Sequence, residues 1–300
     1  MKIIKFAVPY HAFLPPLAIL EESFEAAPYV APLETELRSI GFTPRNPDSS
    51  RLISEFEGGF AFFVRVDEKV IPGAAIASGL REATQKVYEE TGRYPGRKEK
   101  LELRDQVALD YRRKALIKTT VVGCFYNPTT RYLVLSTPSR RLADLVMNLL
   151  HDAVGGLRIE PTHQSELSNQ MITRLKLWLA EEDNAPFDGF ELGTELMLVG
   201  SRKKLTIKTT NIEHSRQAIR EAVESDYTFK LARLEHEDGI SFRFGDDFCL
   251  KSLEYENPND LKADDNGTLW QHEAALQMML LTRALTLLIA MFNVKFELQP

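Results

Sequence analysis

The sequence predicts an α+β protein built on antiparallel sheets. Strand-like and helix-like segments come in separate blocks rather than in strict alternation, and this order favours α+β over a parallel α/β fold. The 300 residues are 44% hydrophobic, enough to bury a large core in one elaborated domain or in two. Turn sequences between neighbouring strand patterns indicate hairpins, which are antiparallel connections.

Strands are predicted where β-branched and aromatic residues alternate with polar ones. The segment 2–9 is interpreted as a first strand rather than a secretory signal, because Pro9, His11, Pro15 and Pro16 interrupt the apolar stretch that follows Lys2 and Lys5. Two further strands form a hairpin around 127–130, and three form a meander with turns at 237–239 and 245–247. With these five and one more at 60–66, the strands predicted after the first are 60–66, 119–126, 131–137, 228–235, 240–244 and 250–255.

Helices are predicted from apolar residues spaced three and four apart. Ser139 is a candidate N-cap and Gly155 with Gly156 a matching stop. The helices on either side of 92–96 are expected to form a hairpin. The segment 269–292 is long enough to span a bilayer, but its polar residues favour a helix packed in a core or an interface. The predicted helices are 31–40, 74–92, 99–116, 139–152, 164–180, 212–225 and 269–292.

The composition describes an acidic intracellular protein. With 43 acidic and 37 basic residues, the formal charge is −6, so any nucleic-acid surface must be a local patch. Cys124 and Cys249 are too few for a disulfide framework or a zinc cluster, and both are expected to be small buried residues in a reducing cytoplasm. Trp178 and Trp270 are expected to anchor the core.

Basic residues are concentrated between 97 and 141. This segment holds eleven Lys or Arg against four acids, a formal charge of +7. Such a segment binds phosphates and releases condensed counterions without reading sequence, although a solvated helix face is an equal alternative. The candidate DNA-binding residues here are Arg97, Lys98, Lys100, Arg112, Arg113, Lys114, Lys118, Arg140 and Arg141.

A second basic cluster comprises Arg202, Lys203, Lys204 and Lys208. Thr206, Thr209, Thr210 and Asn211 lie in the same segment and have short side chains that can hydrogen-bond phosphate oxygens. Taken alone, the cluster is slightly better explained as an edge strand whose lysines prevent aggregation.

Enzyme signatures are absent from the sequence. It has no glycine-rich nucleotide loop, no nucleophile elbow and no zinc-spaced histidine pair, so neither a metal nor a cofactor is expected. Asp246–Asp247 and Asp264–Asp265 raise the alternative of a metal-dependent nuclease, which needs converging acids. The first pair coincides with a turn signal, and the turn interpretation is favoured.

The order of these segments resembles the bacterial RdgC family of recombination-associated proteins, including homologues carried by phages. The resemblance covers nearly the whole chain, and no single motif in it is diagnostic. It rests on the order and spacing of 42–44, 68–73, 80–83, 92–93, 97–100, 103–107, 113–115, 132–139, 240–247 and 250–255.

The resemblance implies a horseshoe-shaped subunit that closes with a second copy into a ring around duplex DNA. It implies a central sheet domain (1–72 and 118–162), a projecting helical tip (73–117) and a base (163–300). Leu116 would lie near one closing contact, and Thr209 with Thr210 at the other. The implied role is non-enzymatic: nonspecific DNA binding in the cytoplasm, associated with the nucleoid, that restrains RecA, without a membrane or small-molecule partner.

The chain departs from the family pattern at the implied contacts. Residues 110–116 lack the usual apolar sequence, and Thr209 and Thr210 replace a typical lysine and glutamine. These departures fall at the two contacts through which the implied ring would close. The main alternative is a protein-interaction module that binds a recombinase or a host defence protein without needing DNA.

Overall fold

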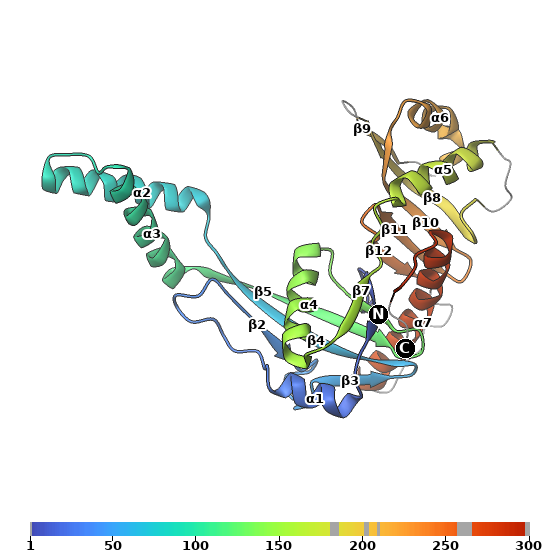
Figure 1. The fold of residues 1–300 in the computed structure, drawn as a ribbon, viewed down its shortest axis with the longest axis horizontal. Helices are drawn as coiled ribbons and strands as arrows, with labels where there is room; N and C mark the ends of the chain where they lie inside the picture. The colour runs from blue at the N-terminus through green and yellow to red at the C-terminus, as the bar shows by residue number, and fades with distance from the viewer. Residues whose placement is uncertain (1, 181–185, 201–203, 209–210, 257–265, 298–300) are drawn as a thin grey trace.

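A computed structural model describes residues 2–180, 186–200, 204–208, 211–256 and 266–297 (Figure 1). The described chain forms two antiparallel sheets with helices packed on them, as the sequence predicts. The first sheet has seven strands in the order β2-β4-β5-β6-β1-β7, with β3 paired to β4. The second has five in the order β12-β11-β10-β8-β9.

The strands of the first sheet are β1 (Val8–Phe13), β2 (Arg38–Thr43), β3 (Ile53–Phe56), β4 (Gly59–Val70), β5 (Leu116–Asn127), β6 (Tyr132–Leu135) and β7 (Arg158–Pro161). The strands of the second are β8 (Phe190–Val199), β9 (Lys204–Lys208), β10 (Thr228–His236), β11 (Ile240–Gly245) and β12 (Leu250–Tyr255). The helices are α1 (Leu17–Glu25), α2 (Gly73–Thr91), α3 (Arg97–Lys114), α4 (Arg140–Val154), α5 (Leu167–Ala180), the 3₁₀ turn η1 (Ile212–Ser215), α6 (Arg216–Glu224) and α7 (Asn266–Met291).

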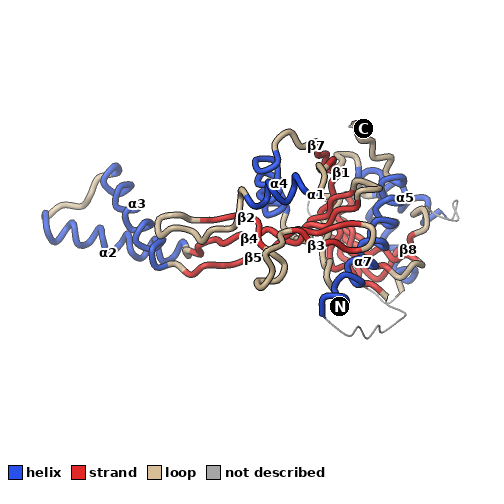
Figure 2. The backbone as a smooth tube through the Cα atoms, turned by 90° about the horizontal axis from the view of Figure 1, so that it is seen from below, coloured by secondary structure: helices blue, strands red, loops and turns tan. Residues whose placement is uncertain are grey.

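A long ribbon of β4 and β5 gives the molecule its extended shape. The two strands pair without interruption from Phe60 with Tyr126 to Val70 with Leu116. Residues near Tyr126 are buried in the core, whereas the first residues of β5 are exposed. The ribbon therefore extends beyond the core, and α2 and α3 lie at its far end (Figures 1 and 2).

Helices α2 and α3 pack on each other through a glycine. A Cβ at Gly79 would lie 2.8 Å from Val107 Cγ1 and 3.0 Å from a ring carbon of Tyr111. The missing side chain thus allows close approach of the two helices. Neither helix has a buried residue, so this contact and the ribbon hold the pair in place.

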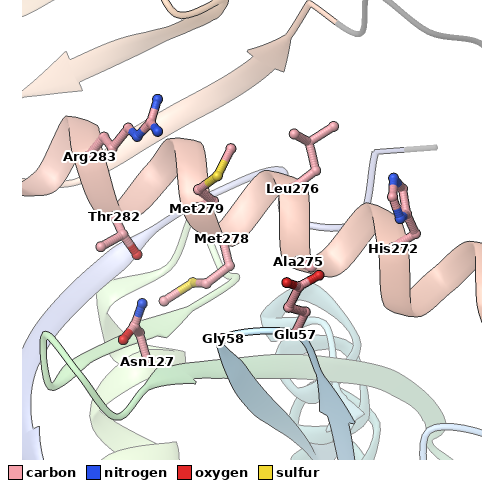
Figure 3. Close-up of a pocket in the computed structure, with 10 residues that line it drawn as sticks. All are labelled: Glu57, Gly58, Asn127, His272, Ala275, Leu276, Met278, Met279, Thr282 and Arg283. Carbon is pink, nitrogen blue, oxygen red and sulfur yellow. The ribbon is translucent and has the colours of Figure 1, made fainter.

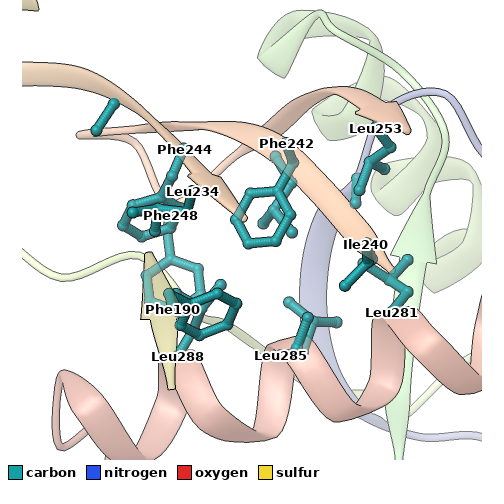
Figure 4. Packing of buried hydrophobic residues seen from close by; sticks show 14 of the residues in the cluster. Phe190, Leu234, Ile240, Phe242, Phe244, Phe248, Leu253, Leu281, Leu285 and Leu288 are labelled. Carbon is teal, nitrogen blue, oxygen red and sulfur yellow. The ribbon is translucent and has the colours of Figure 1, made fainter. Parts of the chain in front are cut away.

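Two hydrophobic clusters hold the body together. In one, α1 and α4 pack on the first sheet, and Phe24 stacks on Phe42 with ring centroids 4.0 Å apart. In the other, α5, α6 and α7 cover the second sheet. Phe242 and Phe244 of β11 point toward Leu285 and Leu288 of α7 there (Figure 4). Truncating one of these phenylalanines to alanine would cost about 3–5 kcal/mol.

The sequence interpretation of α7 as a packed helix is confirmed. Trp270, Ala274, Leu281 and Leu285 are all buried against the body. The stretch Thr268–Met291 is long and apolar enough to cross a membrane by length and composition, and half of its apolar window is buried inside the protein. The buried Gln277 also accepts hydrogen bonds from the backbone N–H groups of Ile3 and Ile4, at 2.9 Å each.

Two predicted elements differ from the structure. The predicted helix 31–40 is wrong: Arg38–Thr43 form β2, which pairs with β4. Residues before β2 are held instead by Lys69, whose Nζ donates to the carbonyls of Leu33 and Glu34. The predicted strand 2–9 begins too early, since β1 spans Val8–Phe13.

Other predictions are confirmed. Ser139 caps α4 by accepting a hydrogen bond from the N–H of Leu142 at 3.3 Å. The β5–β6 hairpin and the β10–β11–β12 meander pair as expected. Both cysteines are free and buried. Helix α1 was not predicted, although Leu17, Leu20 and Phe24 have helical spacing after Pro16.

Candidate DNA-binding surface

The main candidate surface is formed by α3 and the first residues of β5. Helix α3 ends at Lys114 and β5 begins at Leu116, so the basic run 112–114 lies at the helix–strand junction that the sequence indicates. At the start of the helix, the Glu99 carboxylate accepts the N–H of Gly96 at 2.8 Å, which is half of a capping box because glycine has no side chain to form the other half. Glu99 also pairs with Arg93, and these contacts lower the pKa of Glu99 to about 2.

Most basic side chains of this surface are exposed and have no acidic partner. Within the described residues, none of the following makes an ion pair: Arg97, Lys98, Lys100, Arg113, Lys114 and Lys118. Arg112 is half-buried, and its Nε has no hydrogen-bond partner. Unpaired exposed cations are free to exchange their counterions for phosphates.

Arg140 and Arg141, by contrast, are bound to other groups of the same chain. Arg141 donates to both carboxylate oxygens of Glu68, at 2.6 and 2.8 Å, and Arg38 also pairs with Glu68. Burial raises the pKa of the Glu68 carboxyl, but Arg141 and Arg38 outweigh it and leave the pKa below its usual range. Arg140 donates to the backbone oxygen of Asp247 at 3.3 Å.

The second basic cluster lies on an edge strand. β9 is the last strand of the second sheet, and its Lys208 pairs with Glu195 at 3.4 Å. Lys204 begins β9. Arg202, Lys203, Thr209 and Thr210 lie outside the described residues.

The sequence interpretation did not single out Arg233 and Arg243, which lie directly opposite each other on β10 and β11. Their neighbours Leu234 and Phe242 face the core, so the two arginines lie on the other face of the sheet, where the alternation of apolar and polar residues predicts them. Both are already paired, Arg243 with Glu195 at 2.8 Å and Arg233 with Glu235 at 3.2 Å. They add polar surface with little free positive charge.

Comparison with known proteins identifies the family. A family model described as "Putative exonuclease, RdgC" matches residues 5–297. The chain belongs to the RdgC family. The resemblance found in the sequence is thereby confirmed.

Curated relatives of this RdgC chain carry the name recombination-associated protein RdgC. The protein of Neisseria meningitidis is 24% identical over 255 residues, which cover 85% of this chain and 84% of the relative. That of Aeromonas hydrophila is 25% identical over 267 residues, covering 82% and 86%. That of Colwellia psychrerythraea is 23% identical over 244 residues, covering 79% and 78%.

The family description names an exonuclease, and a metal-dependent exonuclease would need acidic residues such as the paired aspartates of this RdgC chain. Asp246 lies in the β11–β12 turn and pairs with Lys230 at 2.7 Å. Asp247 accepts the N–H of Cys249 and pairs with Lys251 at 3.3 Å. The turn interpretation of this pair is confirmed, while Asp264 and Asp265 lie outside the described residues. Among the described residues, no three His, Cys, Asp or Glu side chains are grouped to hold a metal ion.

A cavity of about 430 Å³ lies beside α7 (Figure 3). Ala275, Leu276 and Met278 form its apolar part, and Glu57 and Asn127 line it from the turns of the first sheet. None of the basic candidate residues lines this cavity. The cavity and the basic surface are therefore separate features of this RdgC protein.

Proposed function

We propose that this protein binds DNA nonspecifically, with duplex favoured, and that it does so without catalysis. The proposal rests on one observation. Exposed basic side chains on α3 and at the start of β5 have no acidic partner among the described residues. Such cations bind phosphate oxygens, which are the same for every sequence. The recombination-associated relatives support the same conclusion.

The protein acts as a dimer that closes into a ring around the duplex. In this arrangement residues 73–117 form the projecting tip, 1–72 with 118–162 the central domain, and 163–300 the base. Leu116 supports a closing contact, because its side chain is 82% exposed and pairs across the ribbon with the exposed Val70. The family resemblance assigns the other contact to Thr209 and Thr210, which lie outside the described residues.

By occupying duplex DNA, the ring restrains RecA filament growth or strand exchange. This role places the protein in the cytoplasm, on the nucleoid. It needs no cofactor, and the restraint follows from competition for the same phosphate backbone.

The direct test measures binding of a fluorescent 30-base-pair duplex by anisotropy at several salt concentrations. The affinity should fall steeply with salt, and replacing Arg113, Lys114 and Lys118 with alanine should reduce the slope of log affinity against log salt by about 2 to 3. Lys176→Ala, an exposed lysine of α5, is the matched control. An affinity that does not change with salt would refute the proposal.

Two other functions are distinguished by simple measurements. The apolar cavity beside α7 favours a protein-interaction module. Such a module would bind a recombinase or a defence protein but would not change the electrophoretic mobility of DNA. An exonuclease, which the family description names, would shorten end-labelled DNA when magnesium is added.

A further inference from the structure

Two tyrosines stack on each other where α2 and α3 are connected. The rings of Tyr88 and Tyr94 have centroids 4.4 Å apart and planes inclined by 19°. Gly92 ends α2 with a φ of +70°, a left-handed conformation suited to glycine, and its N–H bonds the carbonyl of Tyr88 at 2.8 Å. This turn and the buried Pro95 bring Tyr94 back onto the last turn of α2.

Both rings are exposed rather than part of a core. Tyr94 is 60% exposed and Tyr88 39%, and α2 and α3 contain no buried residue. Tyr88 covers one face of the Tyr94 ring, and the 60% exposure of Tyr94 leaves much of the remaining ring surface open to solvent. An open aromatic face is the surface on which an unpaired base stacks.

The tyrosine pair is next to positive charge. Arg97 and Lys98 occupy the first turn of α3, where the helix dipole is also positive, and neither makes an ion pair within the described residues. The nearby acids are engaged: Glu99 pairs with Arg93, Glu90 with Lys86, and Glu89 accepts from Gln85. Cations in a helix N-terminal turn oppose the dipole, so their presence there is not explained by helix stability.

We infer that Tyr94, stacked on Tyr88 and flanked by Arg97 and Lys98, is a stacking site for unpaired bases of single-stranded DNA. The inference rests on the proposed DNA binding and extends it to a second form of the ligand. The connection between α2 and α3 lies at the far end of the molecule (Figure 1), so it can reach a single-stranded overhang next to a bound duplex.

The test compares the full-length protein and its variants on a fluorescent 20-nucleotide oligo(dT) and a 20-base-pair duplex. Stacking of one base contributes about 1–3 kcal/mol, so Tyr94→Ala and Tyr94→Leu should weaken oligo(dT) binding about 5- to 150-fold. Duplex binding should change less than about twofold. Tyr94→Phe, which keeps the ring, should restore binding. Leu101→Ala, an exposed apolar residue of α3, is the control.

A spectroscopic measurement separates stacking from a merely structural role. Tyr94→Trp should bind oligo(dT) with its added fluorescence quenched. Trp270 is buried and Trp178 is partly buried under Arg216, so quenching beyond that of the wild type reports contact between the new indole and bases. Equal losses on both ligands, or unchanged oligo(dT) binding by Tyr94→Ala, would overturn the inference without refuting the proposed duplex binding of the wild-type protein. A wild-type protein that binds neither ligand would overturn the proposed function as well.

Discussion

Arg141 and Glu68 form an ion pair with an N–O distance of 2.6 Å, although 73 residues separate them along the chain. The pair joins the start of α4 to β4 and shares its carboxylate with Arg38. Two arginines near the ribbon are therefore held by one carboxylate, which offsets one of their two positive charges. This explains why a count of charges along the sequence overestimates the free positive charge.

Releasing these arginines should strengthen DNA binding. We expect Glu68→Gln to raise duplex affinity about two- to fivefold at low salt, because an exposed ion pair contributes up to about 1 kcal/mol. Anisotropy titration with the duplex measures the change. Glu224→Gln, at the exposed end of α6, adds the same net charge as a control. Equal gains in both variants would show that only total charge matters.

The sequence predicts the elements whose signals are local. Ser139 caps its helix, and the turns at 127–130 and 237–239 connect the expected strands, because caps and turns depend on adjacent residues. The error at 31–40 has a long-range cause: β2 exists because it pairs with β4, and Lys69 holds the residues before it. Helical spacing cannot report such contacts.

In the candidate site, too, some features follow from local sequence and others depend on distant residues. Local composition identifies the basic segment and its densest part at 112–114. Which cations remain free depends on partners far away in sequence, such as Glu68 for Arg141 and Glu195 for Arg243. Tyr88 and Tyr94 are six residues apart, yet their stacking depends on the turn at Gly92.

Asp67 should stabilise the ribbon in a pH-dependent manner. Arg65 donates two hydrogen bonds to its carboxylate at 2.9 Å, and with Tyr29 and Thr119 it lowers the pKa from 3.8 to about 2. Because the folded-state pKa is lowered, the stabilisation is present above about pH 4 and is lost as the pH falls toward 2.

We therefore expect Asp67→Asn to lower the free energy of unfolding by about 1–2 kcal/mol at pH 7. Urea denaturation measures this, and the difference from wild type should shrink as the pH falls below 4. The side chain of Asp67 is 2% exposed, whereas that of its partner Arg65 is 38% exposed, so solvent screens part of the interaction. A difference that persists unchanged near pH 2 would contradict the assigned role of the charge.

The two thiols should be unreactive in the folded protein. Burial raises the pKa of Cys249 to about 12 and raises that of Cys124 further, so almost no thiolate exists at pH 8. We expect Ellman's reagent to modify neither cysteine in native buffer and both in guanidinium chloride. Rapid reaction of one thiol in native buffer would indicate local opening of the strands that carry them.

Gly79 should control how α2 and α3 present the basic surface. A β-branched side chain there would overlap Val107 and Tyr111, because even a Cβ would come within 3.0 Å of each. We expect Gly79→Val to separate the two helices at a cost of about 1–3 kcal/mol locally. Backbone amides of 73–114 should then exchange faster with deuterium, while the amides of α7 keep their protection. Duplex affinity should fall although no charge has changed, whereas Gly73→Val, at a position with open space, should leave both exchange and affinity unchanged.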